Sequence, residues 1–203
     1  MKLTLMMLAL LLGACAQSPK QAVSTQPVKV LKTVYYDGKP DDLLTAGLGL
    51  SGLRGPAPEL PAEPTAAELR RASYYHQFKA LNDLTDAGGM GRLYGLKDSQ
   101  EPIAGHEFWS QRLVANQVHH TVLLQVPDHF DPQRACLVVA PSSGSRNVLG
   151  AVGTSGAWAL IKGCAVVYTD KGTGTAVALS ADQQYRIDGL IGGADDDLAT
   201  APA

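Results

Sequence analysis

A loop of small polar residues gives this chain its clearest opportunity for chemistry. Residues 137–140 form an apolar run, Leu-Val-Val-Ala, and one proline separates this run from Ser142, Ser143, Gly144 and Ser145. Backbone N–H groups in such a loop can converge on an anion. Two chemistries fit, an oxyanion hole for acyl transfer and a phosphate-binding loop. The structural alternative is a tight turn from strand to helix, which also requires small residues.

The glycines that follow this loop do not match a nucleotide-binding motif. Gly150, Gly153 and Gly156 have the spacing G-x-x-G-x-x-G, whereas the dinucleotide fingerprint is G-x-G-x-x-G. The chain also lacks G-x-x-x-x-G-K-[ST], the motif of phosphate-binding P-loops. The oxyanion loop is therefore the sharper chemical hypothesis, and no cofactor is predicted.

A βαβ unit is expected to position the loop. Residues 137–140 and 165–168 are short, continuously apolar runs, typical of strands buried on both faces in a parallel sheet. Residues 157–161 between them are apolar and are followed by Lys-Gly, a common helix C-terminus. Sites in open α/β sheets form at the carboxyl ends of the strands. We therefore expect residues 141–156 and 169–175 to line the site, and the fold class to be α/β.

Earlier segments predict further elements of the domain. A capping box of Thr65 and Glu68 begins the clearest helix, predicted over residues 65–87. Apolar and polar residues alternate over residues 118–126, which predicts a strand with residues 107–113 as its partner. A Gly-rich apolar segment, residues 41–53, is expected to be a loop packed on the core.

The histidines give little support for a metal site. His119 and His120 are adjacent, and adjacent side chains of a strand point to opposite faces. The two imidazoles therefore cannot easily bind one ion, and no metal is predicted.

The N-terminus predicts export. Residues 1–14 combine a positive start with a short apolar run, which indicates a signal peptide rather than a membrane-spanning helix. The run ends in Leu-Gly-Ala before Cys15, a pattern that looks like a bacterial lipobox with Cys15 as the lipidated residue. Residues 15–33 are polar and predict a flexible tether. We expect a protein anchored by lipid, in the outer membrane, or released outside the cell; an ordinary secretory signal is the alternative.

The balance of charged residues bears on which partners the chain could bind. The chain has 203 residues, with 17 basic and 19 acidic side chains and a net charge of −2. That balance gives no reason to expect a nucleic-acid partner.

Three segments carry a resemblance to a known family. Residues 42–49, 64–71 and 88–95 look like the N-terminal part of the D-(−)-3-hydroxybutyrate oligomer hydrolases. The runs Ser-Ser-Gly-Ser-Arg at 142–146 and Gly-Cys-Ala-Val-Val-Tyr-Thr-Asp-Lys-Gly-Thr-Gly at 163–174 resemble the same family more specifically.

The resemblance implies a carboxylic ester hydrolase that cleaves short 3-hydroxybutyrate oligomers, the breakdown products of polyhydroxybutyrate. It implies an α/β-hydrolase-like sheet, in which the loop after the third strand supplies one oxyanion N–H. Residues 142–145 are then the oxyanion candidates. Residues 34–203 are then the N-terminal part of an incomplete catalytic domain.

The chain departs from the family in its nucleophile. It contains no G-x-S-x-G and no comparable Ser-Asn-Gly-Gly-Gly turn. Members of the family are longer, with the serine downstream, so we expect a truncated form with no catalytic residue of its own. No histidine lies where the triad base is expected, whether His76, His106, His119, His120 or His129. The alternative function is a non-catalytic exported lipoprotein that serves as a binding or structural module.

Two cysteines remain if Cys15 carries lipid. Cys136 and Cys164 each precede an apolar strand, and in the α/β-hydrolase order these strands are adjacent and parallel. Neighbouring strands lie about 4.8 Å apart, a spacing that a disulfide accepts. Export to an oxidising compartment favours the bond. The alternative is a pair of buried free thiols that pack as small apolar residues.

Overall fold

The computed structural model describes residues 29–114, 118–143, 146–171, 176–180, 183–186 and 191–192. Its main feature is a mixed sheet of five strands in the order β1-β2-β3-β5-β4. The strands are β1 (Lys29–Tyr36), β2 (Gly105–Val114), β3 (Val118–Pro127), β4 (Leu137–Pro141) and β5 (Ala165–Thr169). Neighbouring strands are antiparallel except β4 and β5, which are parallel. The sequence-based pairings of β2 with β3 and of β4 with β5 are confirmed.

A second, smaller sheet follows in the chain. It has the order β6-β7-β8 and consists of β6 (Ala176–Ser180), β7 (Gln183–Arg186) and β8 (Ile191–Gly192).

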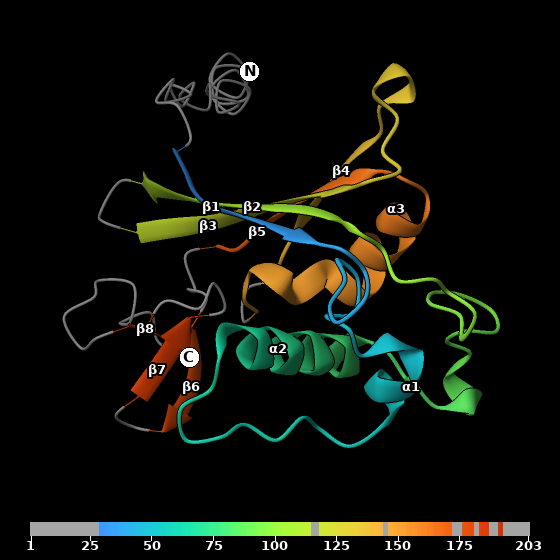
Figure 1. Ribbon diagram of the computed structural model, residues 1–203, viewed down its shortest axis with the longest axis horizontal. Helices are drawn as coiled ribbons and strands as arrows, with labels where there is room; N and C mark the ends of the chain where they lie inside the picture. Colours follow the sequence, from blue (N-terminus) through green and yellow to red (C-terminus); the bar gives the residue numbers. More distant parts are fainter. Residues whose placement is uncertain are drawn as a thin grey trace, which may run out of the picture.

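Helical segments cover one face of the five-stranded sheet (Figure 1). The α-helices are α1 (Gly49–Arg54), α2 (Ala66–Leu81) and α3 (Ala157–Ile161). Short 3₁₀ turns occupy Asp86–Gly88, Pro132–Arg134 and Val148–Ala151, and a π-helical turn, Val152–Gly156, leads directly into α3. The core lies between the sheet and a layer formed by α1, α2, residues 148–156 and α3 (Figure 1), and it includes Tyr74, Phe78, Leu123, Leu160 and Tyr168.

The helix α2 begins as predicted and ends earlier. The Thr65 side chain accepts from the Glu68 N–H, and the Glu68 carboxylate accepts from the Thr65 N–H, so the capping box is confirmed. The helix ends at Leu81 instead of residue 87, because the backbone of Asn82 is extended. Beyond it, the Asp83 carboxylate accepts from both the N–H and the hydroxyl of Thr85, a local turn that competes with helix.

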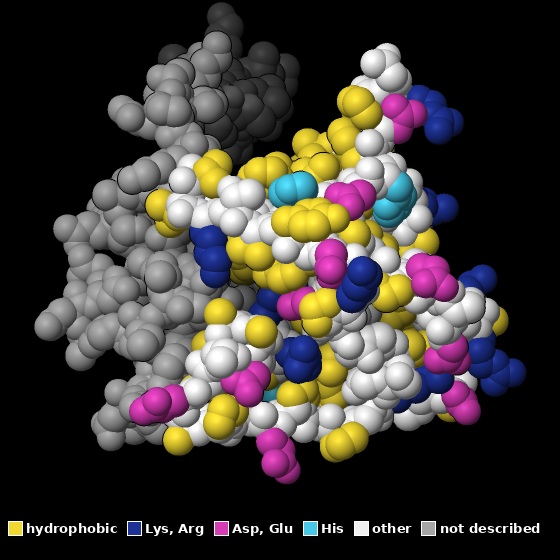
Figure 2. Space-filling model, in the orientation of Figure 1, with side chains coloured by type: hydrophobic (Ala, Val, Ile, Leu, Met, Phe, Trp, Pro, Cys, Tyr) yellow, Lys and Arg dark blue, Asp and Glu magenta, His cyan; other side chains and the backbone are white. Residues whose placement is uncertain are grey.

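Two expectations about the strands were wrong. The first strand begins at Lys29, so residues 29–33 of the predicted tether belong to β1 and pair with β2. The second error concerns β4, which was expected to be buried on both faces. Leu137 and Val139 are each 62% exposed, because β4 ends the sheet and the described helices cover only the opposite face. Figure 2 shows hydrophobic side chains along the top of the molecule, over this part of the sheet.

The Gly-rich segment at 41–53 is packed on the core as expected, but it is not wholly a loop. Leu43, Leu44 and Leu53 are fully buried, and α1 begins at Gly49. In the described part of the chain, no helix is both long and apolar enough to cross a membrane.

Candidate functional site

The carboxyl ends of β4 and β5 meet at one edge of the sheet, as the βαβ unit requires. The Ser142 N–H donates to the Thr169 carbonyl at 2.8 Å, which extends the parallel pairing by one residue. The Ser142 hydroxyl donates to the Arg146 carbonyl at 3.1 Å. Arg146 in turn reaches α2, where its guanidinium donates to the Gln77 side chain and the Ala80 carbonyl. The two flanks of the candidate oxyanion loop are therefore held in place.

These contacts divide the four predicted loop residues. Ser142 is buried and its N–H is already used, so it cannot offer that N–H to an oxyanion. Ser143 is exposed. Gly144 and Ser145 lie outside the described residues, as does Cys15, the predicted lipidation site.

Strand β3 reaches the same edge of the sheet, where it contacts Asp170, the residue directly after β5. The Asp170 side chain is buried, and one carboxylate oxygen accepts from the Thr121 N–H at 3.0 Å. The His120 ring lies 3.3 Å from the Asp170 carbonyl oxygen. Asp170 thus joins the end of β5 to β3, a role that sequence reasoning missed. The available signal was an acidic residue immediately after an apolar strand, although sequence alone does not show which strand it would contact.

The three glycines after the loop have packing roles. A Cβ at Gly150 would crowd the side chains of Arg146 and Ser142. A Cβ at Gly153 would lie 3.0 Å from the Phe78 ring, where the π-helical turn crosses α2. These close contacts explain why small residues stand at Gly150, Gly153 and Gly156.

Gly156 provides a test of this packing. A Cβ there would overlap the hydroxyl of Tyr168, so Gly156→Ala is expected to lower the free energy of unfolding by about 1–3 kcal/mol. Within the described residues, the buried Tyr168 hydroxyl has no hydrogen-bond partner. Adding Tyr168→Phe should therefore recover part of the loss at little cost of its own, while the ring carbons stay 3.0 and 3.1 Å from the added Cβ. Urea denaturation of the two single variants and the double variant measures this; a double variant no more stable than Gly156→Ala would contradict it.

A buried polar cluster connects α2 to the sheet. Arg70 forms ion pairs with Asp41 and, at 2.7 Å, with Glu107, and its guanidinium carbon lies 4.0 Å from the centre of the Tyr36 ring. Gln125 donates to Glu107 at 2.7 Å. These contacts join β1, β2, β3 and α2. The cluster balances a buried cation with buried acceptors, and most of its polar atoms contact one another. Among the described residues, Arg70 Nε and Gln125 Oε1 have no hydrogen-bond partner.

Burial also affects the acidic residue at the margin of this cluster. It raises the pKa of the Asp41 carboxyl to about 6, against the opposing attraction of Arg70. Because the pKa of Asp41 is higher in the folded state than in the unfolded state, ionising this carboxyl costs folding stability. The free energy of unfolding that Asp41 contributes therefore falls as the pH rises from about 4 to 6.

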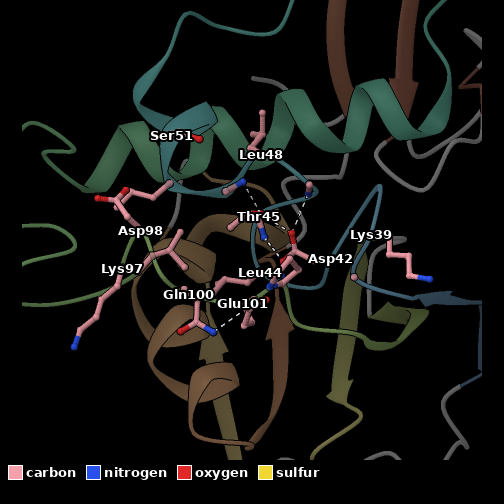
Figure 3. Close-up of a pocket in the computed structure, with 16 residues that line it drawn as sticks. Lys39, Asp42, Leu44, Thr45, Leu48, Ser51, Lys97, Asp98, Gln100 and Glu101 are labelled. Carbon is pink, nitrogen blue, oxygen red and sulfur yellow. Dashed lines mark hydrogen bonds between the residues drawn. The ribbon is translucent and has the colours of Figure 1, made fainter.

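A cleft of about 310 Å³ lies beside α1 (Figure 3). Its buried acid, Asp42, accepts from the backbone N–H groups of Leu44, Thr45 and Gly47 and from the Thr45 hydroxyl. The Thr45 hydroxyl oxygen accepts at 2.9 Å from the N–H of Gly49, the first residue of α1. Both carboxylate oxygens of Asp42 are thus engaged by a turn, which makes the role of this acid structural.

The structure joins Cys136 and Cys164 by a disulfide, the first of the two alternatives for this pair. Their Cα atoms are 4.6 Å apart, and the Ala165 N–H donates to the Cys136 carbonyl at 2.9 Å. The bond thus ties the beginning of β4 to the beginning of β5.

The structure shows no candidate metal site among the described residues. No group of three or more His, Cys, Asp or Glu side chains within those ranges is placed to hold an ion. The side chain of His119 lies outside those ranges.

Comparison with known proteins identifies the family. A family model described as 3HB-oligomer hydrolase matches residues 11–201. A protein of a Polaromonas species (strain JS666), named D-(-)-3-hydroxybutyrate oligomer hydrolase, is 46% identical over 183 residues, covering 83% of this chain and 26% of the relative. A Burkholderia thailandensis protein of the same name is 43% identical over 188 residues, covering 84% of this chain and 26% of the relative.

The chain spans about a quarter of the length of these relatives. No solved structure matches it. The match along most of the chain, together with the identity to both relatives, shows that the chain belongs to the 3HB-oligomer hydrolase family.

Proposed function

We propose that this chain forms part of a carboxylic ester hydrolase that cleaves short 3-hydroxybutyrate oligomers. The observation that carries the proposal is the family match over residues 11–201, with relatives named for hydrolysis of these oligomers. The substrate is a small ester, and neither a cofactor nor a nucleic acid takes part.

The fold we propose for residues 34–203 is the first part of an α/β-hydrolase-like catalytic domain. Parallel strands β4 and β5, joined through α3, support this proposal, since such a unit presents its following loops at one edge. The mechanism is acyl transfer to a serine activated by a histidine and an acid. Because the 203 residues contain no G-x-S-x-G, we place the nucleophile in the part of the family protein that this chain does not span.

The loop after β4 supplies the oxyanion donor in this proposal. Ser142 anchors the loop through its N–H to Thr169, so the donor belongs to Ser143, Gly144 or Ser145. A donor aimed at the developing charge lowers the barrier because it is held in position before the reaction begins.

A chimera tests the hydrolase proposal. In it, this chain replaces the matching segment of the Polaromonas relative, and release of 3-hydroxybutyrate from the linear dimer is measured. The chimera is expected to release the product, and the separate 203-residue chain is not. A folded chimera without activity, beside an active parent protein, would contradict the proposed function and favour the non-catalytic binding or structural module.

We further propose that the protein is exported and held by lipid on Cys15, in the outer membrane, unless it is released outside the cell. The apolar run that ends in Leu-Gly-Ala-Cys supports this placement. A single acyl chain anchors a protein only marginally, whereas several chains hold it stably.

Replacing Cys15 tests the anchor. Cys15→Ser is expected to abolish incorporation of labelled fatty acid and to move the protein from the membrane fraction to the soluble fraction. Radiolabelled palmitate and fractionation measure both effects, and Cys136→Ser serves as the cysteine control that keeps the label. A wild-type protein that takes up no label would show that the signal is processed elsewhere.

A further inference from the structure

A pocket of about 390 Å³ lies beside α3 and the π-helical turn that leads into it, where Gly153 and Thr154 line it. It is formed by three segments distant in the sequence: Asn82 at the end of α2, Tyr94 from the loop before β2, and Trp158, Ile161 and Lys162 on and just after α3. Its volume falls within the range of small-molecule sites, about 300–1,000 Å³. We call it the Trp158 pocket.

The walls of the Trp158 pocket are mainly apolar and aromatic. The Trp158 side chain is 56% exposed and that of Tyr94 is 47% exposed, although both belong to residue types that usually bury their rings. Ile161, one turn after Trp158, adds an aliphatic surface on the same side of α3. This arrangement leaves a large apolar area open to a ligand.

One charge accompanies these apolar walls. Among the described residues that line the pocket, Lys162 is the only Lys, Arg, Asp or Glu. Its ammonium lies 5.6 Å from the centre of the Trp158 ring, within the range of a cation–π contact. The pocket therefore combines an aromatic platform with one cation, and it has no carboxylate to repel an anion.

The wall opposite α3 is held in place before any ligand arrives. The Asn82 side-chain amide donates to the carbonyls of Phe78 and Gly153, at 3.1 and 3.2 Å. The Gly91 N–H donates to the Tyr94 carbonyl at 2.9 Å, which fixes the loop that carries the Tyr94 ring. A preformed site loses less conformational entropy on binding.

From these features we propose that the Trp158 pocket binds the acid end of a short 3-hydroxybutyrate oligomer, an inference that rests on the proposed function. Such a molecule carries one terminal carboxylate on a chain with a methyl group at every unit. Lys162 pairs with the carboxylate, and the rings of Trp158 and Tyr94 contact the methyl groups. The pocket is then a subsite that recognises the free acid terminus and distinguishes short oligomers from long polymer, which has few such ends.

Tryptophan fluorescence provides the direct test on the 203-residue chain. The chain has two tryptophans, and Trp109 is only 4% exposed, so a ligand-dependent change in emission reports Trp158. The linear dimer of 3-hydroxybutyrate is expected to change the emission saturably. Its methyl ester, which keeps the methyl groups and lacks the charge, is expected to bind about threefold more weakly, in keeping with an exposed ion pair.

Two variants and a matched control assign the residues. Lys162→Gln is expected to weaken dimer binding about threefold and to remove the difference between dimer and ester. Lys79→Gln is the control, because Lys79 also lies over an aromatic ring, that of Tyr75 at 5.4 Å, but does not line the Trp158 pocket. Trp158→Ala is expected to weaken binding about tenfold, measured by calorimetry.

The outcomes separate this inference from the proposed function. No saturable binding of the dimer, or equal binding of dimer and ester, overturns the subsite even if the chimera hydrolyses the dimer. Carboxylate-dependent binding that requires Lys162 supports the subsite, and an inactive chimera would then contradict the hydrolase function alone. If circular dichroism shows that Trp158→Ala is unfolded, the Lys162→Gln variant still tests the subsite. Lys162 is exposed, so this substitution is expected to leave the fold intact.

Discussion

Arg70→Met is expected to lower the free energy of unfolding by about 3–5 kcal/mol, because it leaves buried charge without its partner. Glu107 is fully buried and lies 2.7 Å from the Arg70 guanidinium. Methionine fills a similar volume but provides no cation, so the Glu107 carboxylate would keep its hydrogen bonds from Gln125, Tyr74 and Trp109 and lose its counter-charge. The total free energy of unfolding of a domain is about 5–15 kcal/mol, so the variant should unfold at a markedly lower urea concentration.

An exposed arginine gives the matched control. Arg134 pairs with Asp131 at 3.0 Å, but its side chain is 88% exposed, and Arg134→Met should cost less than about 1 kcal/mol. Adding Glu107→Gln to Arg70→Met should recover part of the loss, since it removes the uncompensated charge. Equal midpoints for the Arg70 and Arg134 variants would contradict the role given to the cluster.

Replacing both Cys136 and Cys164 by alanine is expected to lower the free energy of unfolding by about 3–4 kcal/mol. The disulfide closes a loop with a sequence separation of 28 residues, and a cross-link of that length removes conformational entropy from the unfolded chain. The bond also joins the beginnings of β4 and β5, and β4 has no other strand beside it among the described residues. Urea denaturation of the double variant beside the wild type measures the loss.

Two controls isolate the contribution of this bond. Reductant should destabilise the wild type by a similar amount and leave the double alanine variant unchanged. Cys15→Ala, which leaves the bond intact, should not change the unfolding midpoint. If a thiol reagent alkylates both Cys136 and Cys164 of the wild type in the absence of reductant, the bond is absent from the protein and this prediction is contradicted.

Local patterns in the sequence determined much of the framework. The alternation of apolar and polar residues over 118–126 predicted β3, because that pattern is typical of a strand. The face that tertiary packing buries is the one with Thr121, Leu123 and Gln125, not the more apolar one. Thr65 and Glu68 predicted the beginning of α2, since a capping box satisfies backbone groups within four residues. Two apolar runs joined through a short helix predicted the parallel pair β4 and β5. The resemblance carried by residues 142–146 and 163–174 indicated the family.

Other features depended on contacts between residues distant in the chain. The sequence did not indicate that Arg70 is the centre of a buried cluster, because its partners Asp41 and Glu107 lie 29 and 37 residues away in the chain. The open face of β4 followed from the position of the described helices on the opposite face of the sheet (Figure 1), and the engagement of the Ser142 N–H followed from the position of Thr169. The Trp158 pocket likewise exists only where α2, the Tyr94 loop and α3 converge. Sequence patterns report which residues suit a buried or exposed surface, whereas tertiary packing decides which of those surfaces meet.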